Sequence, residues 1–134
     1  MAKGVIRGFH HASVLVKDTR RALEFYSGVL GLEQNHDRPD LSYPGAWLDL
    51  GEGGQIHLIE LPNPDPVQGR PAHGGRDRHT ALTVSSLDRV TAELDAAKLP
   101  YTLSSSGRRA LFCRDYDGNT LELIEQQRGA ESDC

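Results

Sequence analysis

The chain is poor in cysteine, in aromatic residues and in net basic charge. Of its 134 residues, 6% are aromatic and only two, Cys113 and Cys134, are cysteines. Two cysteines cannot supply a disulfide framework, so we expect a reducing, cytoplasmic setting. The formal net charge of −4 provides no basic surface for nucleic acid or an anionic membrane. We therefore predict neither of these as a partner.

Long apolar runs are also absent. No segment approaches the roughly 20 apolar residues of a membrane-spanning helix. The start of the chain, MAKGVIRGFH, lacks the apolar run that is typical of a signal peptide. Hydrophobic residues make up 37% and charged residues 25% of the sequence, which is ordinary for a folded domain. We expect a single domain over residues 1–134.

An internal repeat organises this domain. HASVLVKD at 11–18 aligns with HTALTVSS at 79–86, and IHLIEL at 56–61 aligns with LELIEQ at 121–126. In each copy an alternating strand precedes a helical segment, and two or three further strands follow. The segment between the copies is rich in proline and glycine, as linkers are. The repeat predicts an α+β fold of two βαβββ modules, with module one at about 5–61, a linker at 62–77 and module two at about 78–127.

Four residues of metal-ligand type coincide in the repeat. His11 aligns with His79, and His57 aligns with Glu122. Imidazole and carboxylate together suit Zn, Ni, Fe or Mn, and the absence of cysteine from the set argues against a soft-metal site. A single strand histidine is more often a satisfied polar residue, and Glu122 alone could face solvent. The shared register of all four favours a metal site lining a cavity between the modules.

The remaining histidines are expected to serve other purposes. Neighbouring residues of a strand point to opposite faces. His10 should therefore lie on the face opposite His11, as a packing or edge residue. His36 and His73 stand in polar or glycine- and proline-rich surroundings and are expected to be solvated.

Strand parity also places two aromatic residues beside the proposed ligands. Trp47 and Phe112 should face the same side as the metal, where they could form an apolar wall for a substrate or simply pack. The opposite face is expected to belong to the core, with Leu48, Leu50, Leu111 and Cys113. Arg108 and Arg109 could bind an anionic substrate or lie in solvent. DYDGNT at 115–120 fails the calcium-loop pattern and is interpreted as a hairpin turn.

The segments HHASVLVKDTRRALEFYSGVLGLE, QIHLIEL, RHTALTVSSLDRV and DYDGNTLELIE resemble the vicinal oxygen chelate superfamily, from about residue 9 to residue 126. This superfamily includes glyoxalase I, extradiol dioxygenases, fosfomycin-resistance enzymes and bleomycin-binding proteins. The resemblance implies paired βαβββ modules and a divalent transition metal held by His11, His57, His79 and Glu122. It also implies Lewis-acid catalysis on a small-molecule substrate, with Glu122 as the catalytic general base.

The resemblance leaves the reaction open. A glyoxalase-like lyase or isomerase acting on a small oxygenated substrate is the leading prediction. Leu15, Leu61 and His57 depart from the glyoxalase I pattern, which weakens glutathione as the thiol. An iron-dependent extradiol dioxygenase is the alternative, although Phe112 stands where those enzymes tend to carry tyrosine. Ser13 takes the place of a substrate-contacting threonine in the fosfomycin enzymes, whereas a drug-sequestering protein is expected to lack the ligand set.

A homodimer with its sites near the interface is also expected. Two short modules joined by a linker of about 16 residues can pair within one chain or with those of a second chain. The resemblance implies the second arrangement, because two-module members are commonly dimers and some of their metal sites are built from both chains. The alternative is a monomer whose two modules close one site internally.

Overall fold

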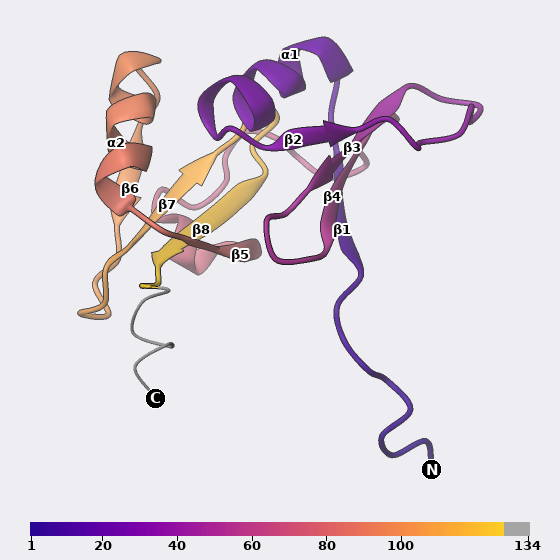
Figure 1. The fold of residues 1–134 in the computed structure, drawn as a ribbon. Coiled ribbons are helices and arrows are strands. Elements are labelled where there is room, and N and C mark those ends of the chain that lie inside the picture. The colour runs from indigo at the N-terminus through magenta and orange to yellow at the C-terminus, as the bar shows by residue number, and fades with distance from the viewer. Residues whose placement is uncertain (128–134) are drawn as a thin grey trace.

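A computed structural model describes residues 1–127 as two four-stranded mixed sheets that lie side by side (Figure 1). Sheet one has the strand order β1 (His11–Leu15), β4 (Gln55–Ile59), β3 (Gly45–Asp49), β2 (Glu33–Asn35). Sheet two has the order β5 (His79–Val84), β8 (Thr120–Glu125), β7 (Ala110–Arg114), β6 (Tyr101–Leu103). In each sheet the first pair is parallel and the other pairs are antiparallel. The predicted α+β fold of two repeated modules is confirmed.

The two modules share their register as well as their strand order. In sheet one Ser13, two residues after His11, pairs with His57. In sheet two Ala81, two residues after His79, pairs with Glu122. Paired residues of adjacent strands face the same side of a sheet, and so do residues two apart on one strand. Each sheet therefore presents its two proposed ligands on a single face.

Each module carries its helical segment between its first and second strands. In module one, α1 (Thr19–Leu23) continues into a π-helical turn, η1 (Glu24–Val29), and in module two α2 spans Leu87–Ala96. Asp18 and Ser86 cap the two helices by accepting hydrogen bonds from the backbone N–H three residues on. The first helical segment ends before Gly31, whose φ of +77° favours glycine.

One apolar core joins the modules. Buried residues of both sheets and of both helical segments form a single cluster, which includes the predicted Leu48, Leu111 and Cys113, with Leu50 half-buried at its edge. Within this cluster the hydroxyl of Tyr26 donates to Asp115 Oδ2 at 2.7 Å. The bond connects η1 of module one to the β7–β8 turn, so the modules are fixed to each other inside one chain. Asp115 and its neighbours form the hairpin turn predicted for DYDGNT.

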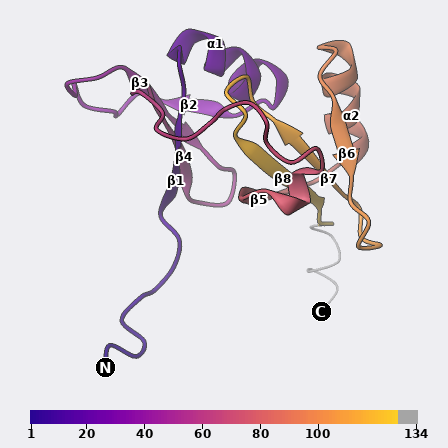
Figure 2. The same cartoon turned by 180° about the vertical axis from the view of Figure 1, so that it is seen from behind.

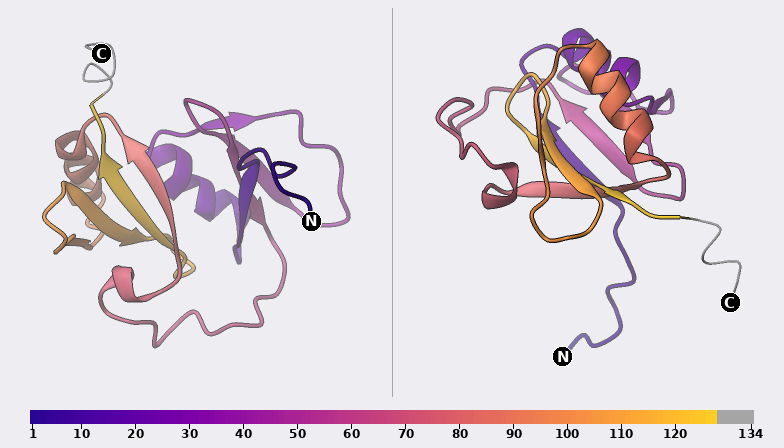
Figure 3. Two further views of the ribbon diagram at one scale, coloured as in Figure 1. Left: turned by 90° about the horizontal axis from the view of Figure 1, so that it is seen from below. Right: turned by 90° about the vertical axis from the view of Figure 1, so that its left-hand side faces the viewer.

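The segment between the modules crosses from β4 to β5 along the back of the molecule (Figure 2). It contains a short 3-10 turn, η2 (Gly74–Arg76), that packs on β7 and β8. Seen from below, this segment runs around the outside of both sheets (Figure 3, left), and the second view shows the N-terminal segment extending away from them (Figure 3, right). Within residues 1–127 no helix is long and apolar enough to cross a membrane. Cys134 lies outside the described residues.

Candidate functional site

Sheet one presents a stack of three rings on its ligand face. Ser13, His57 and Trp47 form one row across β1, β4 and β3. The ring of His57 lies between His11, with 3.8 Å between ring centroids, and Trp47, with 4.6 Å, and all three rings are nearly parallel. Trp47 is thus on the predicted face. The stack leaves His11 exposed and His57 and Trp47 half-buried.

A chain of hydrogen bonds orients His57 within this stack. Asp49 Oδ1 accepts from Asn35 Nδ2 at 3.1 Å and from Gln55 Nε2 at 2.9 Å. The amide oxygen of Gln55 lies 2.8 Å from His57 Nε2 and is left to accept its hydrogen. This arrangement leaves Nδ1 as the free nitrogen of His57. Partial burial, together with the neighbouring His11, holds the pKa of His57 below its usual value.

His10 does not lie on the face opposite His11, where it was predicted to be a packing or edge residue. Strand β1 begins at His11, so strand parity does not extend to His10, whose side chain is exposed. Its Nδ1 lies 2.8 Å from Nδ1 of His11, and the two rings meet edge to face. His10 is therefore a direct neighbour of a proposed ligand, and no packing residue. His36 is exposed, as expected.

Sheet two presents an imidazole beside a carboxylate. His79 Nε2 lies 3.3 Å from Glu122 Oε1, and the side chain of Glu122 is only 6% exposed. Phe112 pairs with Glu122 in register and meets the ring of His79 edge to face, 5.3 Å away. The sequence allows Arg108 either to bind an anionic substrate or to lie in solvent. In the structure, Nη2 of Arg108 lies 3.1 Å from Glu122 Oε2. Each carboxylate oxygen of Glu122 thus faces a nitrogen, Oε1 that of His79 and Oε2 that of Arg108.

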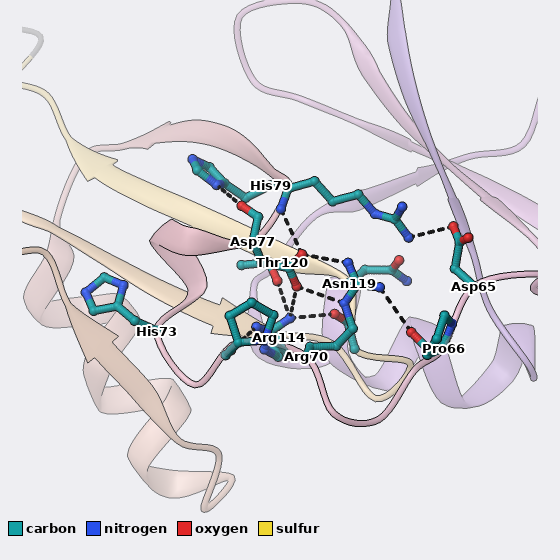
Figure 4. Close-up of polar contacts among 12 residues, drawn as sticks. Asp65, Pro66, Arg70, His73, Asp77, His79, Arg114, Asn119 and Thr120 are labelled. Atoms are coloured by element: carbon teal, nitrogen blue, oxygen red, sulfur yellow. Dashed lines mark hydrogen bonds and ion pairs between the residues drawn. The ribbon is translucent and has the colours of Figure 1, made fainter.

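The other nitrogen of His79 is also engaged. Its Nδ1 lies 2.8 Å from the backbone carbonyl oxygen of Asp77 (Figure 4). A carbonyl can only accept, so Nδ1 carries the hydrogen, which leaves Nε2, beside Glu122 Oε1, as the nitrogen that can bind a cation. The Asp77 carboxylate contacts Arg70 and Arg114, and these two guanidinium groups hold the pKa of Asp77 far below its usual range.

His73 is half-buried rather than fully solvated as predicted. Its ring packs against Phe112, with 5.2 Å between the ring centroids, and its Nδ1 accepts from the backbone N–H of Gly75 as the cap of η2. The next residue, Gly74, lies so close to sheet two that a Cβ there would come within 2.8 Å of Phe112 and of Thr120. The linker therefore covers part of the ligand face, and Phe112 is left 8% exposed.

The four proposed ligands fall into two pairs, one on each sheet. Their chemistry, three imidazoles and one carboxylate, fits a divalent transition metal. In the described part of a single chain, however, no three His, Cys, Asp or Glu side chains lie close enough to hold an ion. Each module by itself supplies half of a ligand set.

Sequence reasoning missed the residues that support these pairs. The position of Gln55 could have been predicted, because Gln55 lies two positions before His57 on one strand and must share its face. Asp77, Arg70 and Arg114 gave no such signal, because their meeting depends on the path of the linker.

Residues 8–123 match the sequence model of the Glyoxalase/Bleomycin resistance protein/Dioxygenase superfamily, and the chain belongs to this family. It is 32% identical over 128 residues to the uncharacterized protein YwkD of Bacillus subtilis (strain 168), covering 91% of this chain and 99% of that one. It is 28% identical over 123 residues to Glyoxylase I 4 of Arabidopsis thaliana, covering 88% and 70% respectively.

Solved structures share the fold. The fosfomycin resistance protein FosX of Listeria monocytogenes, as its E126Q mutant complexed with Mn(II) and 1S,2S-dihydroxypropylphosphonic acid, superposes with a TM-score of 0.69. The match covers 96% of this chain and 99% of that one at 20% identity.

Proposed function

We propose that the chain is a metal-dependent, glyoxalase-like lyase or isomerase that acts on a small oxygenated substrate as a homodimer. The observation that carries the proposal is the division of the ligand set. His11 and His57 lie together on sheet one, and His79 and Glu122 lie together on sheet two. Two copies would complete two sites, each from module one of one copy and module two of the other.

The strand order supports this assembly. β1 and β5, which begin with His11 and His79, are the end strands of their sheets. An end strand presents unpaired backbone groups that a second chain can approach. Meeting of β1 of one copy with β5 of another would bring the two half-sets together at the interface. Within one chain, the shared core and the Tyr26–Asp115 bond hold the sheets in their present relation.

The roles of the residues follow from their surroundings. A divalent metal held by the four ligands would supply a Lewis acid for vicinal oxygens of the substrate. Glu122 would take and return a proton at the adjacent carbon as general base. Ser13, Trp47 and Phe112 are the proposed substrate contacts, with Ser13 exposed and Trp47 half-buried beside His57. Phe112 would contribute only its small exposed part, next to His79.

One observation favours a second candidate, an iron-dependent extradiol dioxygenase. His57 Nε2 is bound to Gln55, and Gln55 is in turn held by Asp49. If the stacking of His57 between His11 and Trp47 keeps its free Nδ1 from the ion, His11, His79 and Glu122 remain as two imidazoles and one carboxylate, the set typical of non-haem Fe(II) oxygenases. Iron in the purified protein, with oxygen uptake on catechols, would favour this candidate. Zinc or nickel, with isomerisation of a hemithioacetal, would favour the first.

Metal content and complementation test the proposal. We expect protein purified without added metal to carry about one ion per chain, and His11→Ala, His79→Ala and Glu122→Ala each to lose it. His36→Ala is the matched control, because it removes an exposed histidine. His10→Ala should also retain the ion.

Mixing His11→Ala with Glu122→Ala tests whether sites are shared between chains. In a mixed dimer one site would combine both substitutions and the other would be intact, so about half of the metal binding in each mixed dimer should return. No recovery in a mixture whose chains are shown to exchange would refute shared sites. Light scattering that gives a monomer near 14.7 kDa at micromolar concentration would refute the dimer.

A further inference from the structure

We propose that Arg70, Asp77 and Arg114 form a clamp that positions His79 and fixes which of its nitrogens is free. Arg70 lies in the linker, Asp77 lies two residues before the start of β5, and Arg114 is the last residue of β7 (Figure 4). The proposed role toward the metal rests on the proposed function above. The fixing of the His79 tautomer does not, because it concerns this chain alone.

The clamp is built around the Asp77 carboxylate. Arg70 contacts it with two nitrogens, Nη2 at 2.6 Å from Oδ1 and Nε at 3.0 Å from Oδ2. Arg114 Nη1 lies 2.8 Å from Oδ2. The side chain of Asp77 is 5% exposed, against 20% for Arg70 and 25% for Arg114. Paired contacts of this kind fix direction as well as distance, so the clamp restrains the rotation of Asp77.

Arg114 connects the clamp to sheet two. His79, Thr120 and Arg114 form one row across β5, β8 and β7. Arg114 also donates to the Thr120 hydroxyl, to the carbonyl of Gly118 at 2.9 Å and to that of Pro71 at 2.6 Å. The guanidinium thus joins the turn before β8, the linker and Asp77 at a single point.

The restraint reaches His79 through the backbone. With the Asp77 side chain fixed on both oxygens, its carbonyl points at His79 Nδ1, 2.8 Å away. The backbone N–H of Arg78 donates to Asp77 Oδ1 at 2.8 Å and stiffens the same peptide. His79 is therefore held as the Nδ1–H tautomer, with Nε2 directed at Glu122. Such outer partners commonly orient metal-binding histidines.

The tautomer can be measured directly in metal-free protein. With the chain labelled at the histidine ring nitrogens, long-range proton–nitrogen correlation spectra above pH 8 separate the two tautomers. The signals of His79 are identified by their absence in His79→Gln. In the unaltered protein we expect Nδ1–H to exceed Nε2–H at least about tenfold.

Asp77→Asn removes the charge of the clamp while nearly keeping its shape. We expect the preference for Nδ1–H to fall at least about fivefold, and Zn²⁺ affinity by about 10- to 100-fold. Arg70→Gln is the second disrupting variant, which keeps the test decisive if Asp77→Asn does not fold. Arg70→Lys, which retains the charge, should restore part of the preference.

Arg78→Gln is the matched control. The Arg78 guanidinium pairs with Asp65 at the surface. Arg78 contacts the Asp77 carboxylate through its backbone N–H, which the substitution keeps. An unchanged tautomer ratio in folded Asp77→Asn or Arg70→Gln would overturn the clamp, as would an equal change in Arg78→Gln. A purely structural role would lower thermal stability without moving the ratio. If the tautomer is fixed but no metal binds, the proposed function fails and the clamp stands.

Discussion

Removing the hydrogen bond between Tyr26 and Asp115 tests most directly how the two modules are held together. The hydroxyl donates at 2.7 Å to a carboxylate that is 5% exposed, and Tyr26 itself is 0% exposed. Tyr26→Phe removes one oxygen atom and leaves the ring in the core. The other hydrogen bonds of Asp115, from Asn119 and from the backbone of Asp117, remain.

The expected cost follows from the type of bond. A hydrogen bond to a charged group contributes about 1.5–3 kcal/mol, and Asp115 Oδ2 keeps one other donor, Asn119 Nδ2. We therefore expect Tyr26→Phe to lower the free energy of unfolding by about 2 kcal/mol. For a chain of this length that corresponds to a fall in Tm of roughly 6–10 °C. Urea titration and calorimetry at one fixed protein concentration measure both quantities.

The pH dependence of the free energy of unfolding tests the same hydrogen bond in a second way. Burial, reinforced by the Asp115 charge, raises the pKa of Tyr26 well above its usual value. The stabilisation is complete below the unfolded pKa of about 10 and is lost as pH rises above it, because only the unfolded chain then gives up the proton. The gap between the unaltered protein and Tyr26→Phe should narrow there by at most about 1.4 kcal/mol per pH unit.

Tyr116→Phe is the matched control. The ring of Tyr116 packs against Phe25, and its hydroxyl has no hydrogen-bond partner within residues 1–127. We expect a change within about 0.5 kcal/mol. If Tyr26→Phe costs no more than this control, the bond does not hold the modules together and the reasoning fails.

Two further predictions concern the core and the linker. Burial raises the pKa of Cys113 to about 12. In a Cys134→Ser variant, which leaves Cys113 as the one thiol, the folded protein should therefore react with a disulfide reagent at pH 8 about 10³-fold more slowly than the protein unfolded in urea. Comparable rates in the two states would contradict the burial of Cys113. Gly74→Ala should lower the free energy of unfolding by about 1–3 kcal/mol, because the added methyl group meets β7 and β8. Gly51→Ala, where a Cβ meets nothing within 4 Å, should be close to neutral, and equal effects of the two in urea titrations would count against the packing of the linker on sheet two.

Periodicity explains what the sequence could predict. Alternation and the repeat register place Trp47 with His57 and Phe112 with Glu122, because side chains of paired strands share a face whatever the rest of the fold does. The helix cap at Asp18 is similarly local, since it depends on a backbone N–H three residues away.

Contacts that depend on the linker could not be predicted in this way. His73 reaches Phe112, and Arg70 reaches Asp77, only because the linker folds back over sheet two. A proline- and glycine-rich composition indicates a connection and says little about its path. The prediction for the side-chain direction of His10 was wrong for a different reason. Strand β1, which should have fixed that direction, begins one residue later.

Both halves of the proposed site are organised before they meet. The amide of Gln55 orients His57, and the carbonyl of Asp77 orients His79, each within its own module. Little side-chain freedom would then be lost when a second copy and a metal complete the ligand set, so association would be opposed mainly by the loss of overall motion of the copies. Because only the assembled form would hold the ion through all four ligands, metal binding and dimer formation would stabilise each other by mass action. In such a system, the residues that orient each half influence metal affinity and dimer stability together.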